Sequence, residues 1–274
     1  MISQLWAAWR RRAEARAVAR RPIPDDLWKR TLVRYPFLKQ RDPADQAELR
    51  RLTSLFLDRK EFSAAGGLRM TNDVVVAIAA QAVLPVLKLG LDRYDGFVGI
   101  VVHPQPVRVR REHLDEDGVQ HEYDEELAGE AMAGGPVMLS WTDVRSSGRH
   151  PGPAYNVVIH EFAHVLDLAD GASDGTPLLP PDLPRATWAD VMAQAFERFS
   201  ARLARNDASV LDPYGETGPD EFFAVASETF FVLPQGLRDE DPALYALLAR
   251  FYRQDPAVGH ETAVLGVSKS RQQG

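Results

Sequence analysis

The chain has 274 residues, of which 45% are hydrophobic and 26% are charged, and it contains no cysteine. This length can bury a substantial core, and the composition is that of an ordinary soluble globular protein. Without cysteine there are no disulfides, thiolate metal sites or cysteine nucleophiles, so a metal ion would need histidine and carboxylate ligands. A formal net charge of −7 gives no support for nucleic-acid binding.

The N-terminal residues 1–21 form a basic arm with six arginines and one acidic residue. This arm is either a frayed, solvated terminus or a contact for an anionic membrane or an acidic partner. We expect a single domain over 22–256 and a flexible tail over 257–274. No apolar stretch is long enough to span a bilayer and no export signal is recognisable, so we expect a cytoplasmic protein.

The first half of the body combines helices with short strands. Apolar periodicity predicts helices over 44–61 and 72–89, and a β-branched run predicts a strand over 97–102. Residues 107–110 extend this strand or pair with it. The acidic stretch over 112–126 is typical of a loop or an exposed hairpin.

The second half begins with a predicted strand over 135–144, in which Pro136 favours a sheet edge. Apolar-periodic segments then predict helices over 155–169, 186–205, 219–232 and 243–253. The fold class is therefore α+β, with a small mixed sheet surrounded by helices.

Residues 160–164 read His-Glu-Phe-Ala-His within an apolar-periodic helix. Positions i and i+4 lie one turn apart on the same face, so His160 and His164 can bind one Zn²⁺ together. Glu161 projects from a neighbouring angle, where it acts as a general base on the water that the zinc ion activates. The alternative is a helix with two half-buried, hydrogen-bonded histidines.

A zinc site of this kind needs a third protein ligand, and no further histidine follows at a short fixed spacing. Glu221 and Glu228 lie seven residues apart in an otherwise apolar helix, and so share one face. Charged side chains on such a face are usually paired or metal-bound. The periodicity does not choose between the two glutamates.

Ligand histidines usually donate their second ring N–H to a carboxylate or a carbonyl. Asp167 follows His164 by three residues on the same stripe of the helix, where it either serves that histidine or is a plain helix-end carboxylate. Glu228 is a second candidate for this supporting role.

Several longer segments match the Mlc titration factor A family of bacterial zincins in sequence, order and separation. The matching segments are 61–62, 66–68, 78–82, 135–141, 156–167 and 221–228. Because they are spread over nearly the whole body, this resemblance is more specific than the five-residue histidine motif.

The resemblance implies a zincin-like zinc metallopeptidase with one Zn²⁺ per chain and an edge strand beside its active-site helix. The family's glutamate ligand opens the run Glu-Phe-Phe-Ala-Val, which here is Glu221. A tyrosine seven residues earlier, Tyr214, is implied to donate a hydrogen bond to the oxyanion; the alternative is a plain loop tyrosine. By fold-level analogy, the strand over 135–144 is the edge strand that binds substrate backbone.

Two functions follow from these observations. The first is hydrolysis of peptide bonds in a peptide or protein substrate, with aminopeptidase and endopeptidase activity both left open. The alternative is a non-catalytic regulatory protein, because members of the resembled family bind and sequester the transcriptional repressor Mlc. Both functions can reside in one chain.

Overall fold

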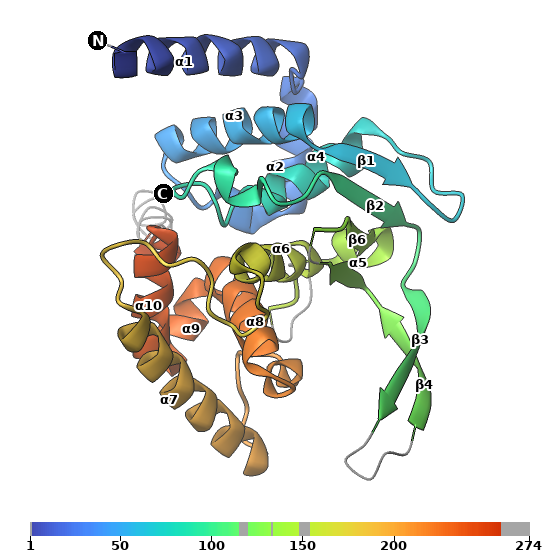
Figure 1. Cartoon of the computed structure of the whole chain (residues 1–274), viewed down its shortest axis with the longest axis vertical. Helices are drawn as coiled ribbons and strands as arrows, with labels where there is room; N and C mark the ends of the chain where they lie inside the picture. Colours follow the sequence, from blue (N-terminus) through green and yellow to red (C-terminus); the bar gives the residue numbers. More distant parts are fainter. Residues whose placement is uncertain (1, 115–119, 133, 148–153, 259–274) are drawn as a thin grey trace, which may run out of the picture.

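The computed structural model describes four stretches of the chain, residues 2–114, 120–132, 134–147 and 154–258. Its α-helices are α1 (Ile2–Arg20), α2 (Asp25–Arg34), α3 (Pro43–Arg59), α4 (Asn72–Ala82), α5 (Trp141–Ser146), α6 (Val157–Asp167), α7 (Arg185–Ala204), α8 (Pro219–Val232), α9 (Pro234–Glu240) and α10 (Pro242–Tyr252). Figure 1 shows α1 to α4 toward one end of the molecule and α7 to α10 toward the other, with the strands along one side. This is the predicted α+β class.

The main sheet has four strands in the order β1-β2-β6-β5. β1 (Glu61–Ala64), β2 (Gly99–His103) and β6 (Val137–Ser140) run parallel, and β5 (Gly129–Ala131) runs antiparallel to β6. The sheet is therefore small and mixed, as the sequence predicts. β5 lies at one edge of the sheet, where it contacts α6.

The prediction of an edge strand over 135–144 is wrong in two respects. β6 is an interior strand, paired with β2 on one side and with β5 on the other. It also ends at Ser140, whose hydroxyl accepts a hydrogen bond from the Asp143 N–H and so caps α5. Pro136 precedes the strand, where its missing N–H costs no ladder hydrogen bond.

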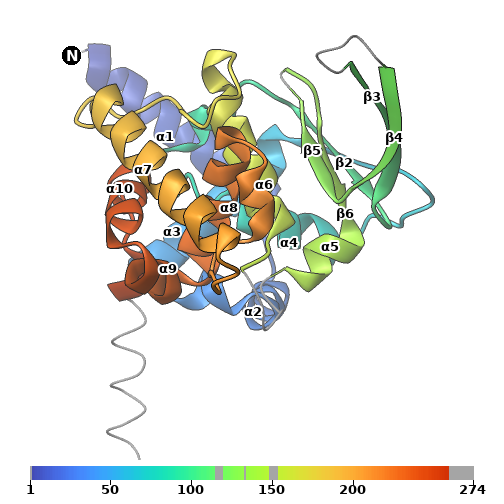
Figure 2. The same cartoon turned by 90° about the horizontal axis from the view of Figure 1, so that it is seen from below.

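The acidic stretch takes part in a separate antiparallel hairpin. β3 (Val107–Leu114) pairs with β4 (Gln120–Leu127), in a register that sets Val107 opposite Leu127. Figures 1 and 2 both show this hairpin projecting from the body. Its second strand leads directly into β5, so the hairpin and the edge strand are continuous in the chain.

Five of the six predicted helices agree closely with the structure, the sixth is shorter than predicted, and α2 and α9 have no predicted counterpart. The helix predicted over 72–89 is α4, which begins at the predicted Thr71 cap but ends at Ala82. Pro85 explains the early end, because a proline lacks the N–H that the helix needs and disfavours helical geometry in the residue before it. Turns follow as far as Gly90.

The basic N-terminal arm is helical, and its last turns lie along α3. Ala17 is buried, and the Nε and Nη2 atoms of Arg20 donate to the two carboxylate oxygens of Asp58 at 3.0 and 2.7 Å. Most of the predicted tail, residues 259–274, lies outside the described part of the chain. Among the described residues, no helix is both long and apolar enough to cross a membrane.

An aromatic cluster fixes α6 in the core. Phe162 is fully buried, and its ring centroid lies 5.0 Å from that of Tyr94 and 5.7 Å from that of Phe56. Such contacts stabilise the helix beyond the area that they bury. Because Phe162 points into this cluster, His160 and His164 are directed to another side of α6, toward α8.

Candidate metal centre

The first turn of α6 is tied down by Asn156, which precedes the helix. Its side-chain oxygen accepts a hydrogen bond from the Ile159 N–H at 3.0 Å, as an N-cap does. Its side-chain amide donates to Gln81 on α4 at 2.9 Å. Asn156 is fully buried, so this bridge holds the start of α6 against α4 from within the core.

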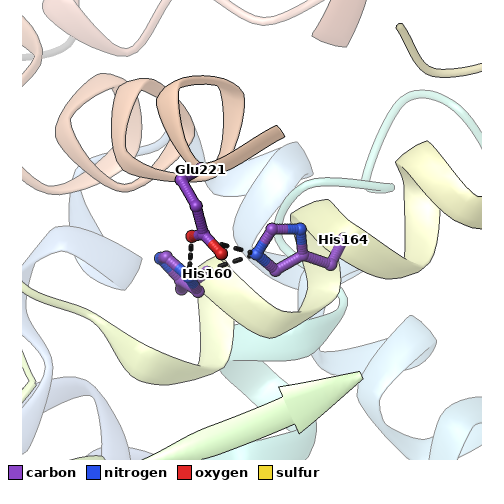
Figure 3. Close-up of side chains that lie close together, drawn as sticks. All are labelled: His160, His164 and Glu221. Carbon is purple, nitrogen blue, oxygen red and sulfur yellow. Dashed lines mark hydrogen bonds and ion pairs between the residues drawn. The ribbon is translucent and has the colours of Figure 1, made fainter. Parts of the chain in front are cut away.

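Two histidines from α6 and one glutamate from α8 converge on a single point (Figure 3). The Nε2 atoms of His160 and His164 are 3.2 Å apart. One oxygen of Glu221, Oε2, lies 3.0 Å from the first nitrogen and 3.3 Å from the second. The structure thus brings together the three residues that the sequence analysis assigns as ligands.

This triangle fits a metal ion on geometric grounds. In a tetrahedral site with metal–ligand bonds of about 2.0–2.1 Å, the ligand atoms lie about 3.3 Å from one another. The three distances between the two Nε2 atoms and Glu221 Oε2 are close to this value. Glu221 Oε2 is moreover a buried oxygen that has no hydrogen bond among the described residues, and buried polar atoms are rarely left so. The cluster of His160, His164 and Glu221 is therefore compatible with a bound metal ion.

Glu228 supports His160 from the opposite side of the ring. Its Oε1 lies 2.8 Å from His160 Nδ1, and its Oε2 accepts a hydrogen bond from the Asn156 N–H. A carboxylate in this position favours a proton on Nδ1, which leaves the Nε2 lone pair directed at the metal position. Glu228 is thus the partner of a proposed ligand, and the geometry distinguishes it from Glu221, which the periodicity could not do.

The supporting role considered for Asp167 is wrong. Within the described residues Asp167 makes no hydrogen bond to His164, and its Oδ2 accepts from the Gly175 N–H at 2.9 Å. This bond holds the loop after α6 against the end of the helix. Burial raises the pKa of Asp167 to about 6.

Different surroundings give the site carboxylates different proton affinities. Burial raises the pKa of Glu161 to about 7, although the two histidines oppose the rise. Burial alone would also raise the pKa of Glu221, but the neighbouring His160 and His164 outweigh it and lower that pKa to about 2. Burial lowers the pKa of His160, yet its contacts with the carboxylates of Glu221 and Glu228 outweigh it and raise that pKa well above its usual range. The carboxylates around His160 therefore favour positive charge at that side chain.

Gly129 on β5 determines where the Glu161 side chain can lie. A Cβ atom at position 129 would sit 2.5 Å from Glu161 Oε1 and 2.6 Å from its Cγ, closer than atoms can approach. Only glycine leaves room for this carboxylate against the edge strand. The sequence analysis missed Gly129, since a glycine in an acidic run carries no signal of a contact with a helix 30 residues away.

Two cavities open beside the histidines. One of about 280 Å³ is lined by His160, His164 and Glu221 together with residues of β5. The other, of about 190 Å³, lies beside Glu161 and has apolar side chains such as Val157 and Val225 in its wall. Both are lined by Glu161, so this carboxylate faces the space in which a bound molecule would lie.

Tyr214 lines both cavities as well. It lies in a short 3-10 helix, η4 (Pro213–Glu216), which Asp212 begins by accepting a hydrogen bond from the Tyr214 N–H. Its ring centroid is 6.1 Å from that of His160, and the side chain is 47% exposed. The tyrosine is therefore beside the centre and accessible from solvent.

The α+β fold places two histidines one helical turn apart and brings a glutamate from a second helix to them. The buried carboxylate of Glu161 lies beside these three residues. Together these features define a candidate metallohydrolase site. The family model of the glucose-regulated metallo-peptidase M90 matches residues 6–253 of the chain. The chain belongs to this family, which is a family of metallopeptidases, and the resemblance to Mlc titration factor A is confirmed.

The relatives carry two kinds of name. Mlc titration factor A of Edwardsiella ictaluri is 38% identical over 224 residues, which is 81% of this chain and 85% of that protein. Mlc titration factor A of Yersinia pestis is 33% identical over 261 residues, 93% of this chain and 91% of that protein. An uncharacterized protein of Synechocystis is 34% identical over 255 residues, 92% of this chain and 91% of that protein.

Proposed function

We propose that this protein is a zinc-dependent peptidase that hydrolyses peptide bonds in the cytoplasm. The observation that carries the proposal is the convergence of His160 Nε2, His164 Nε2 and Glu221 Oε2 to within 3.0 to 3.3 Å of one another. Two imidazoles and one carboxylate are a ligand set typical of catalytic zinc, which leaves a fourth position open. When bound, zinc supplies Lewis acidity that polarises a peptide carbonyl and acidifies water.

Glu161 acts in this proposal as the general base and later as the proton donor. It is buried beside the ligands, and its pKa of about 7 suits a group that takes up and releases a proton near neutral pH. Gly129 leaves the space that this carboxylate occupies, because a Cβ atom at that position would lie 2.5 Å from Glu161 Oε1. Glu161 is therefore a base with a fixed position as well as a suitable proton affinity.

Tyr214 would stabilise the negative charge that develops on the carbonyl oxygen. Its phenol faces the same cavities as His160 and Glu161. A neutral O–H directed at a developing oxyanion contributes most in the transition state, which is where catalysis requires it. We assign it the role of oxyanion donor.

The substrate backbone would bind along β5. Among the described strands β5 pairs with β6 alone, and all three of its residues, Gly129 to Ala131, line the cavity at the candidate metal centre. An extended peptide can add to the free edge of such a strand through main-chain hydrogen bonds. This assigns to β5 the role that the sequence analysis expected of residues 135–144.

The decisive experiment is the variant Glu161→Gln. It keeps the size and hydrogen-bonding capacity of the side chain but cannot accept the proton, so we expect zinc content near one per chain and peptide hydrolysis reduced at least 100-fold. The matched control is Glu197→Gln on the exposed face of α7, which should leave both measurements unchanged. Full activity of Glu161→Gln would contradict the mechanism.

A second function is favoured by the names of the relatives, Mlc titration factor A. We propose that the protein also binds an Mlc-like transcriptional repressor. Pull-down with a purified repressor should be compared between the wild type and His160→Ala. Binding that survives loss of the metal would assign the interaction to a surface independent of the centre, whereas absence of binding by both proteins would refute this second proposal.

A further inference from the structure

One groove in the structure contains an arginine, Arg41, whose guanidinium group is incompletely hydrogen-bonded. The groove has a volume of about 1060 Å³ and runs between the start of α3 and the segment that follows α10. None of the residues that line it lines the two cavities at the metal centre. Arg41, immediately before the Asp42 cap of α3, forms part of its wall.

Two donors of the Arg41 guanidinium are buried without a partner. Its Nη1 donates to the Gln40 carbonyl at 2.8 Å, but neither Nε nor Nη2 has a hydrogen bond to any residue that the structure describes. Buried guanidinium groups are almost always paired, because an unsatisfied buried charge is costly. Burial lowers the pKa of Arg41 to about 10, so the group still carries its charge at neutral pH.

These two atoms are the ones that other arginines of this chain use to hold a carboxylate. Arg20 binds Asp58 through Nε and Nη2 at 3.0 and 2.7 Å, and Arg51 binds Glu48 through the same pair, both at 2.7 Å. The Nε–Nη2 edge of a guanidinium matches the two oxygens of a carboxylate or phosphate. In Arg41 this edge has no such partner.

The acidic residues around the groove are already engaged. Asp42 caps α3, Asp45 forms an ion pair with Lys88, and Asp255 accepts a hydrogen bond from the Tyr245 hydroxyl. Lys39 adds a further positive charge to the lining. Asp45 also attracts Arg41 electrostatically, but among the described residues no carboxylate hydrogen-bonds to the Nε or Nη2 of Arg41.

Two unpaired acceptors complement this donor edge. Within the described part of the chain, the side-chain oxygens of Gln40 and Gln254 are buried without a hydrogen bond, and both residues line the same groove. A phosphate that carries an O–H can donate to such an oxygen, whereas a carboxylate cannot.

We propose that Arg41 anchors a binding site for a small molecule with an oxyanion group, a phosphate or a carboxylate, in this groove. The guanidinium would hold two oxygens of the anion through Nε and Nη2. The site is separate from the metal centre and does not depend on the proposed peptidase activity.

The test uses inorganic phosphate as the probe and the full chain at constant ionic strength. Phosphate should raise the melting temperature of the wild type and give a saturable calorimetric signal. Arg41→Gln should lose both, and Arg41→Lys should bind at least tenfold more weakly because an ammonium lacks the paired edge. Arg59→Gln, which removes the same charge at the exposed end of α3, should behave as the wild type.

The ligand-free melting temperature separates this role from a structural one. If Arg41 serves a ligand, Arg41→Gln without phosphate should melt at or above the temperature of the wild type, because an unpaired buried charge has been removed. Acetate in place of phosphate tests the carboxylate source, and weaker binding of acetate would indicate a phosphate ligand. Equal phosphate binding by wild type and Arg41→Gln would mean an adventitious ion only and overturn the proposal, as would absence of binding by both anions.

Discussion

Three carboxylates near the candidate metal centre hold protons with different affinities because their neighbours differ. Glu221 faces two imidazoles and has a pKa of about 2, whereas burial raises the pKa of Glu161 to about 7 and that of Asp167 to about 6. Glu221 is thus ionised and suited to a cation, and Glu161 is suited to proton transfer. Asp167 has a structural role, since its Oδ2 accepts a hydrogen bond from the Gly175 N–H. Its other oxygen has no hydrogen-bond partner among the described residues.

Asp167 should make the free energy of unfolding depend on pH. A carboxyl whose pKa is higher in the folded state than in the unfolded chain favours folding while it is protonated. Its contribution is full below about pH 4, the unfolded value, and is lost as the pH rises through about 6. Relative to Asp167→Asn, the wild type should therefore gain about 1 kcal/mol between pH 7 and pH 4, after allowance for solvent screening. Urea unfolding at both pH values tests this, with the exposed Asp190→Asn as a control that should show no such difference.

At the scale of elements, the contact between β5 and α6 positions the proposed base. Gly129→Ala adds a methyl group where the Glu161 carboxylate lies, so that carboxylate must move. We expect kcat/KM for a peptide substrate to fall by about 10- to 100-fold, because small displacements of a catalytic group are costly, while the zinc content stays unchanged.

Gly96→Ala is the control for this substitution, because a methyl group at position 96 meets no atom within 4 Å. Unchanged activity of Gly129→Ala would show that catalysis tolerates displacement of Glu161. Loss of zinc together with activity would indicate that β5 supports the ligands as well as the base.

At the scale of the whole molecule, the candidate metal centre joins α6 to α8, two helices far apart in the sequence. A metal ion bound only by the folded chain stabilises it by about 4 kcal/mol when its concentration is 1,000 times Kd. A chelator should therefore lower the melting temperature of the zinc-loaded protein by about 5 to 15 °C, and readdition of zinc should restore it. His160→Ala should show no response to the chelator; an equal response would place the stabilising metal elsewhere.

The local sequence alone determined most of the helices, because apolar periodicity, caps such as Thr71 and a first-turn proline such as Pro219 act over one or two turns. It also determined that His160 and His164 share a face, since this follows from helical geometry. The choice of Glu221 needed more than spacing, and in the sequence analysis it depended on the family resemblance.

Only the tertiary structure decided which elements meet. In the tertiary structure β5 is the edge strand in place of β6, Glu228 contacts the Nδ1 atom of His160, and Gly129 lies against Glu161. These contacts join residues that are distant in sequence, and short-range patterns carry no information about such pairings. The unpaired edge of Arg41 belongs to the same class of finding, because whether a charge lacks a partner depends on everything that is packed around it.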